Sequence, residues 1–323
     1  MVQQKQRYVW IDYMKVYGLY FIVLGHFFPT YSSYIYAFSV PLFFIVSGAL
    51  SKKEHDFKTF MNKSLYNLII PFGIIVMIQY VWDSVMHPDI VGGRIKTVER
   101  FANAIIGNVS GAGTCWFVYT LFVLKLLHQT LSKQILRVLL LVLPMTAVLL
   151  IHNDIAPGNS ILNATVAYPF YWVGMFLNQR LDKLTNVNIG KTTYVSVCIS
   201  LVVLIVVGRL NWLPWIHVNA YGRYLLLYII GGLAGTYIIY FMSILSDRYF
   251  GMNKYIQLLS VGSIVILGFH NTVIIDFIHQ CNIGIDDYNA ILYSFGIMLL
   301  FIPINMFFEK YLPIIYGKRL RRQ

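Results

Sequence analysis

Three ionisable side chains lie in the first long apolar run of the sequence. Asp12 and Lys15 are three residues apart, a spacing that places both on one face of a helix. Lys15 and His26 are eleven residues apart, which at about 100° per residue returns to within roughly 20° of that face after a rise of about 16 Å. Ionisable groups are expensive to bury in a membrane, so the stripe is a functional candidate. The alternatives are a snorkelling Lys15 that only pairs with Asp12, and a hydrogen-bonded core histidine.

Three further segments place polar or aromatic residues in apolar surroundings. Residues 41–48 (PLFFIVSG) end in Ser47 and a glycine, which lets a helix or a ligand approach the backbone. Trp116 and Phe117 follow a glycine-rich stretch, where a tryptophan is also common as an interfacial anchor. His270 is a second histidine at membrane depth. Histidine suits proton transfer near neutral pH, so this set is compatible with acid–base chemistry.

The composition excludes several classes of protein. Of the 323 residues, 58% are hydrophobic and only 12% are charged, whereas a typical soluble domain has about 25% charged residues. This composition excludes a water-soluble globular protein. The net charge of +12 does not indicate nucleic-acid binding, because the basic residues lie between long apolar runs rather than on a polar face. The three cysteines show no metal or disulfide spacing, and we expect no metal site.

The apolar runs predict an all-α integral membrane protein. A spanning helix needs about 20 mostly apolar residues, and the runs are too long and continuous for barrel strands. No soluble domain is expected beside the single transmembrane domain of residues 1–323. The expected helices cover residues 11–29, 34–51, 66–85, 114–130, 136–152, 161–178, 192–208, 223–243, 258–278 and 288–308.

The basic residues predict the orientation of these ten helices. With the N-terminus in the cytoplasm, inside segments carry roughly 18 lysines and arginines and outside segments roughly 5, which favours both termini inside. The long outside connection, 86–113, is glycine-rich and is a candidate lid or re-entrant segment. The charged tail 317–323 is expected to bind the headgroups of anionic membrane lipids.

These motifs together resemble the membrane-bound acyltransferase-3 family of sugar and polysaccharide O-acetyltransferases, in particular proteins similar to fucose 4-O-acetylases. Members carry a basic residue, ten intervening residues and a histidine in the first helix, which Lys15 and His26 match. The family's Pro-Leu-Phe-Phe segment matches 41–48, its Trp-Phe motif matches residues 116–117, and its late serine and histidine resemble 260–270. Many members have two arginines before the proline of the third helix; Lys63 and Asn67 stand there in this chain.

The resemblance implies a reaction and roles for the residues. Acetyl-CoA would be the donor, and the acceptor would be a hydroxyl of a glycan or lipid-linked sugar, in a bacterial inner membrane. His26 would be the general base or, less simply, an acyl-carrying nucleophile. The side chains that would support His26 are Asp12, Lys15 and His270. For His270 three roles are open: it could orient His26, donate a hydrogen bond to the oxyanion, or only pack. Trp116 and Phe117 would line the acceptor site. Residues expected to hold the donor are Lys15, Ser47, Lys52, Lys53 and Lys63.

Two other classes of function fit the same features. A transporter or flippase for a sugar or lipid-linked glycan shares the helix number, the aromatic content and the buried charges, but it needs no thioester site. A structural partner in a polysaccharide export complex needs no His26. The absence of an internal repeat counts mildly against a transporter built from two similar halves.

Overall fold

The computed structural model describes residues 7–27, 29–88, 94–156, 158–281 and 287–317, and within them every regular element is helical. The all-α prediction is therefore confirmed. In chain order the helices are α1 (Val9–Phe27), α2 (Ser32–Tyr36), α3 (Ser39–Ala49), α4 (Phe57–Ser64), α5 (Ile70–Met86), α7 (Arg94–Ile105), α8 (Val109–Ala112), α9 (Trp116–Thr130), α10 (Lys133–His152), α11 (Asn163–Leu177), α12 (Leu181–Thr185), α13 (Lys191–Leu210), α14 (Leu225–Phe250), α15 (Lys254–Val261), α16 (Ser263–Phe269), α17 (Asp276–Gln280) and α18 (Asp287–Tyr311).

Seven helical segments of the described chain are long and apolar enough to cross a membrane, and a bent pair raises the number to eight. The pair is α15 followed by residues 263–279, with a bend of 60°. The seven segments are Ser32–Ala49, Phe57–Met86, Val109–Thr130, Lys133–His152, Lys191–Leu210, Leu225–Phe250 and Asn289–Tyr311. With the bent pair counted as the predicted span over 258–278, two of the ten predicted spans are missing, namely α1 and α11. The total of ten and the side on which the termini lie stay predictions.

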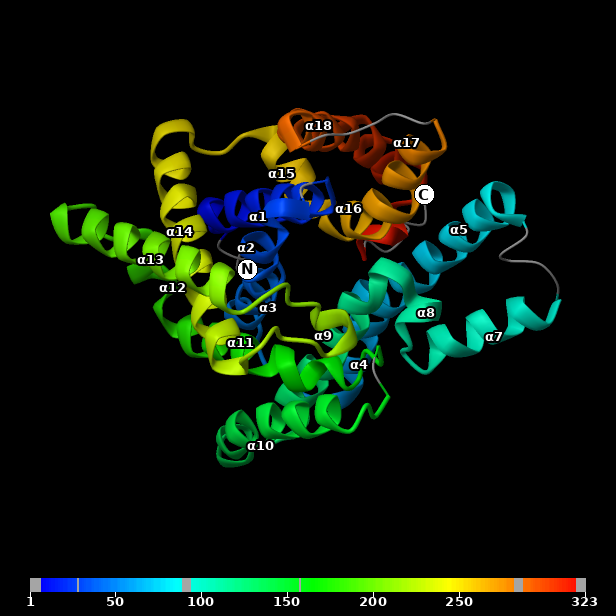
Figure 1. The fold of residues 1–323 in the computed structure, drawn as a ribbon, viewed down its shortest axis with the longest axis horizontal. Coiled ribbons are helices and arrows are strands. Elements are labelled where there is room, and N and C mark those ends of the chain that lie inside the picture. Colours follow the sequence, from blue (N-terminus) through cyan, green and yellow to red (C-terminus); the bar gives the residue numbers. More distant parts are fainter. Residues whose placement is uncertain (1–6, 28, 89–93, 157, 282–286, 318–323) are drawn as a thin grey trace.

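The helices α1 and α11 both lie inside the bundle. The first carries Asp12, Lys15 and His26, which lower its hydropathy, and the second has only 15 residues. Both are largely buried: α1 packs on α3, α14, α15 and α18, while α11 packs on α3, α9 and α10 (Figure 1). By contrast, α10 and α13 lie at the periphery and expose apolar side chains, as expected for lipid-facing helices (Figure 1).

The contact between α3 and α11 brings two helix backbones together. A Cβ atom on Gly48 of α3 would lie 2.1 Å from the carbonyl oxygen of Tyr171, and one on Gly174 of α11 would lie 2.0 Å from that of Ile45. Only glycine permits this approach, which is typical of small-residue contacts between membrane helices. The Ser-Gly end of residues 41–48 therefore serves helix packing, one of the two uses expected for it.

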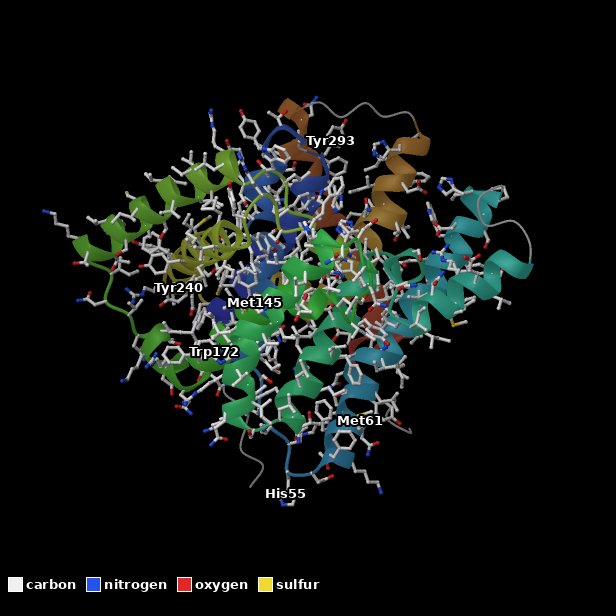
Figure 2. The ribbon with its side chains drawn as sticks, turned by 60° about the horizontal axis from the view of Figure 1, so that its bottom comes forward. His55, Met61, Met145, Trp172, Tyr240 and Tyr293 are labelled. Atoms are coloured by element: carbon white, nitrogen blue, oxygen red, sulfur yellow. The ribbon has the colours of Figure 1, made fainter. Side chains whose placement is uncertain are left out.

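The structure corrects the limits of several predicted helices. The third span begins at Phe57 rather than at 66, because Asp56 caps it by accepting a hydrogen bond from the backbone N–H of Thr59 (2.8 Å). In Figure 2 His55, the residue before this cap in the sequence, lies at the lower edge, while Tyr293 of α18 lies at the upper edge. The span predicted over 258–278 is broken at Gly262 and continues as a π-helix, η6 (His270–Ile275).

The connection predicted as a glycine-rich lid over 86–113 is partly helical. It contains α7, a charged amphipathic helix that projects at the right of Figure 1, and α8, which continues into α9 through a 3-10 turn. Gly111 of α8 packs directly on the backbone of α7. Residues 318–323 of the basic tail lie outside the described part of the chain.

We predict that Gly48→Ala lowers the free energy of unfolding by roughly 1–3 kcal/mol, because the new methyl group must push α3 away from α11. The matched control is Gly296→Ala on α18, where a Cβ atom meets nothing within 4 Å. The control should be neutral or stabilising, since alanine favours helix by about 1 kcal/mol. Thermal unfolding in detergent measures both; equal effects of the two substitutions would contradict the packing argument.

Candidate functional site

Two cavities of different chemistry lie at opposite ends of α1. Tyr8, just before the helix, lines the first, and His26, near its end, lines the second. The 18 residues between them correspond to about 27 Å of helix, close to the thickness of the hydrocarbon core of a bilayer. We name them the basic cavity and the histidine cavity after the side chains described below.

The basic cavity has a volume of about 1110 Å³ and is built mainly from the ends of α3 and α9 and from α4. Its charged lining consists of four lysines and one glutamate, so it carries an excess of positive charge. Lys63 pairs with Glu54, and the Nζ atom of Lys53 donates to the carbonyl of Leu131 (2.7 Å). Asn67 also lines this cavity. The four lysines are Lys52, Lys53, Lys63 and Lys125.

A chain of hydrogen bonds forms one wall of the basic cavity. The hydroxyl of Tyr171 donates to Ser51 Oγ (2.7 Å), and Ser51 Oγ lies 2.9 Å from Nδ1 of His128. A serine hydroxyl has one hydrogen and two lone pairs, so Ser51 can bond Nδ1 of His128 in either tautomer while it accepts from Tyr171. The excess of lysines is what makes this cavity suited to an anionic ligand.

The histidine cavity has a volume of about 580 Å³ and a mostly aromatic and apolar wall. His26 comes from α1, Trp116 and Phe117 from the start of α9, and His270 from η6. His217 comes from the connection between α13 and α14, and its ring centroid lies 6.3 Å from that of Trp116. Burial lowers the pKa of His217 from its ordinary value, so this side chain is neutral at pH 7.

His26 and His270 face each other across this cavity, with ring centroids 5.1 Å apart. Nδ1 of His270 lies 2.9 Å from the carbonyl oxygen of Ile266 and 3.1 Å from that of Leu267. Carbonyls only accept, so Nδ1 carries the hydrogen and Nε2 of the neutral ring carries a lone pair. Nε2 is buried and has no hydrogen-bond partner among the described residues. The neutral His270 ring therefore offers an acceptor to the cavity, not an oxyanion donor.

A second set of hydrogen bonds holds the wall beside His270. The carbonyl oxygen of Gly268 accepts from Nε2 of Gln79 (2.6 Å), from the hydroxyl of Thr114 (2.9 Å) and from that of Thr272 (3.0 Å). Gln79 also donates to Thr114 (3.1 Å) and is itself fully buried. These bonds join α5, the turn before α9, and η6, so the cavity wall is fixed by three separate segments.

Asp12 has partners that the helical spacing did not indicate. Its carboxylate accepts from Nε of Arg7 (2.7 Å) and from the hydroxyl of Ser260 on α15 (2.5 Å). The carboxylate is buried, so these two bonds stabilise its charge and tie α15 to α1. In the described part of the chain, Asp12 lines neither cavity.

The structure brings the predicted residues into two groups. Trp116, Phe117, His26 and His270 share the histidine cavity, and Lys52, Lys53 and Lys63 share the basic one. Two predicted donor residues, Lys15 on α1 and Ser47 on α3, are half-buried and line neither cavity as far as the described residues extend.

Three lining residues were not predicted from the sequence: Lys125, His128 and His217. Each lies near a predicted span end or in a loop, where the sequence alone indicates a snorkelling or solvated side chain. A basic residue and a histidine three residues apart on one helix, as in Lys125 and His128, is a signal that was available.

The sequence matches a known protein family over most of its length. A family model described as acyltransferase domain, Acyl_transf_3, matches residues 8–310, nearly the whole chain. The chain belongs to the acyltransferase-3 family. Neither a curated protein nor a solved structure gives a significant match to it. The resemblance drawn from the motifs is thereby confirmed, and acyltransferase activity in a multi-pass membrane protein is supported.

We predict that Asp12 and Ser260 are energetically coupled by about 1.5–3 kcal/mol, the range for a hydrogen bond to a charged group. Asp12→Asn, Ser260→Ala and the double variant form the cycle, measured by denaturation in detergent micelles. Ser196→Ala on α13 is the matched control and should be additive with Asp12→Asn, because Ser196 bonds only locally, to the carbonyl of Thr192. Additivity of the Asp12 and Ser260 substitutions would contradict the assigned bond.

Proposed function

We propose that this acyltransferase moves an acetyl group from cytosolic acetyl-CoA to a hydroxyl of a sugar in a glycan or polysaccharide, with His26 as general base. The observation that carries the proposal is the pairing of a basic cavity and a histidine cavity at the two ends of α1. A transferase with an anionic donor and a polar acceptor needs both kinds of site, whereas a transporter needs no anion site of this kind.

The basic cavity suits the donor. Coenzyme A carries several phosphate groups and a long arm, and lysines bind phosphates as point charges. Four lysines and His128 line this cavity, which has a volume of about 1110 Å³. Lys63 and Asn67 line it together, at the positions where many family members carry arginines. Lys63, Lys125, Lys52 and Lys53 would hold the phosphates.

The histidine cavity suits the reaction. The thioester supplies an activated acyl carbon, so the chain has to hold the acceptor, take its proton and exclude water. His26 removes the proton of the sugar hydroxyl as its oxygen bonds to the acyl carbon; the carbon–sulfur bond then breaks, and the thiolate takes the proton. Trp116 and Phe117 offer aromatic faces on which a sugar ring stacks. The Nε2 lone pair of His270 accepts an N–H of His26 when the side chains close on substrate, and so orients it.

The arrangement also supports a direction of transfer. The lysine-rich ends of the helices are cytoplasmic by the positive-inside rule, which assigns the basic cavity to the cytosol. The histidine cavity, about 27 Å along α1, then lies in the outer half of the inner membrane. We propose that a lipid-linked or exported glycan receives the acetyl group there.

We predict that acetyl-CoA and CoA stabilise the purified chain saturably and that Lys63→Ala or Lys125→Ala weakens binding about tenfold each, roughly 1.4 kcal/mol. Lys191→Ala, at the exposed start of α13, is the matched control and should bind normally. Thermal unfolding against donor concentration, with a nucleotide sugar as control ligand, makes the measurement. If the unfolding temperature does not rise at donor concentrations up to about 1 mM, the proposal fails and the transporter hypothesis is favoured.

We predict that His26→Ala lowers the rate of acetyl transfer by about 10²–10⁴-fold while donor binding stays unchanged, because only the proton transfer is lost. His152→Ala, at the exposed end of α10, is the control and should have no effect. The measurement uses labelled acetyl-CoA outside sealed inverted vesicles. Labelled acceptors only on the donor side would contradict transfer across the membrane, and full activity of His26→Ala would contradict its role as base.

A further inference from the structure

A third cavity adjoins His26 on the side away from the aromatic wall. It has a volume of about 320 Å³ and is lined by Asp83 and His87 at the end of α5, and by Asp276 and His279 on α17. We call it the polar pocket. Neither the sequence motifs nor the proposed acetyl transfer assigns a role to these four residues. Its size lies at the lower end of the range of small-molecule pockets, roughly 300–1,000 Å³.

The polar groups of this pocket are held in place by neighbouring side chains. Nε1 of Trp82 donates to Asp276 (2.8 Å), and Nε2 of His87 lies 3.0 Å from both oxygens of the same carboxylate. Arg100 of α7 pairs with Asp83 at 2.6 Å. These bonds orient each carboxylate before any ligand arrives. A carboxylate has about four acceptor positions, so positions remain for the donors of a ligand.

His26 belongs to the polar pocket and to the histidine cavity at once. Asn271 and Thr272 of η6 also line both. One imidazole thus separates a wall of aromatic and apolar side chains from a wall of carboxylates and histidines. His270, whose ring centroid lies 5.1 Å from that of His26, lines the histidine cavity and not the polar pocket.

Sugars are the ligands whose chemistry matches both walls. A pyranose has apolar C–H faces that stack on Trp116 and hydroxyl donors that carboxylates accept. Among the described residues Arg100 pairs with Asp83, while Asp276 lies against His87, which compensates its charge only when protonated. With a neutral His87 the two carboxylates leave an excess negative charge that repels a ligand bearing its own carboxylate. Such discrimination by like charge is a common source of specificity.

We propose that the polar pocket is a second acceptor subsite, in which Asp276 and Asp83 bind the hydroxyls of a neutral sugar residue and exclude uronic-acid residues. This inference rests on the proposed function and names its substrate class: a neutral glycan that lies across His26, with one residue against Trp116 and the next in the polar pocket. Asp276 and Asp83 are binding residues here and take no part in the proton transfer.

The test measures sugar binding without donor. The probes are methyl β-glucoside and methyl β-glucuronide, presented to the purified full-length chain in detergent and followed by saturation-transfer NMR. The wild type should bind the neutral glycoside and exclude the charged one. Asp276→Asn keeps an acceptor for Trp82 but removes the charge, so binding of the neutral probe should weaken about fivefold and the preference over the glucuronide should collapse.

Two further variants keep the test decisive. Asp83→Asn changes the same pocket from a different helix and should shift the preference in the same direction even if Asp276→Asn fails to fold. Asp154→Asn is the matched control: Asp154 is exposed in the turn after α10 with φ of 52°, a conformation that asparagine tolerates, and it should bind as the wild type does.

The possible outcomes separate this inference from the proposed function. Equal binding of the two probes by the wild type, an unchanged preference in both pocket variants, or no saturable binding of the neutral probe at about 10 mM would overturn the subsite. Failure of acetyl-CoA to bind would overturn the acetyltransferase proposal but would leave a measured sugar preference standing.

Discussion

The polar side chains of α1 cannot face lipid, and the arrangement of the bundle follows from that constraint. Asp12 is buried and is satisfied by Arg7 and Ser260, so α15 must lie beside α1. His26, near the other end of the helix, opens into cavities and not into the membrane. Surrounding α1 with α3, α14, α15 and α18 meets both requirements, and it makes this helix the link between the two ends of the protein.

The close contact of α3 and α11 determines what lies around that link. Because Gly48 and Gly174 let the two backbones touch, Tyr171 of α11 reaches Ser51 just after α3, and through it His128 of α9. The same contact buries large aromatic rings between the helices. A packing motif of small residues thus forms the wall of the basic cavity, although neither glycine contributes a chemical group.

Departures from regular helix place the remaining groups. The bend at Gly262 and the π-helical turn over His270–Ile275 interrupt what would otherwise be a single span. Such turns recur at functional sites because they re-aim side chains and free backbone carbonyls. Here they bring the ring of His270 within 5.1 Å of the ring of His26 and place Thr272 in both the histidine cavity and the polar pocket. The carbonyl of Gly268 accepts hydrogen bonds from the side chains of Gln79 and Thr114.

Composition and local motifs were enough to establish the all-helical membrane class and the family, because both are properties of short stretches of the chain. The meeting of Trp116 with His26 was implied only by the resemblance, and which distant helices pack together depends on tertiary structure. The bond from Ser260 to Asp12 joins residues 248 positions apart, and the contact of His217 with Trp116 joins residues 101 positions apart (217 − 116); no periodicity encodes such contacts. The positions of the helix breaks also escaped prediction, since apolar runs look continuous across a bend that tertiary packing stabilises.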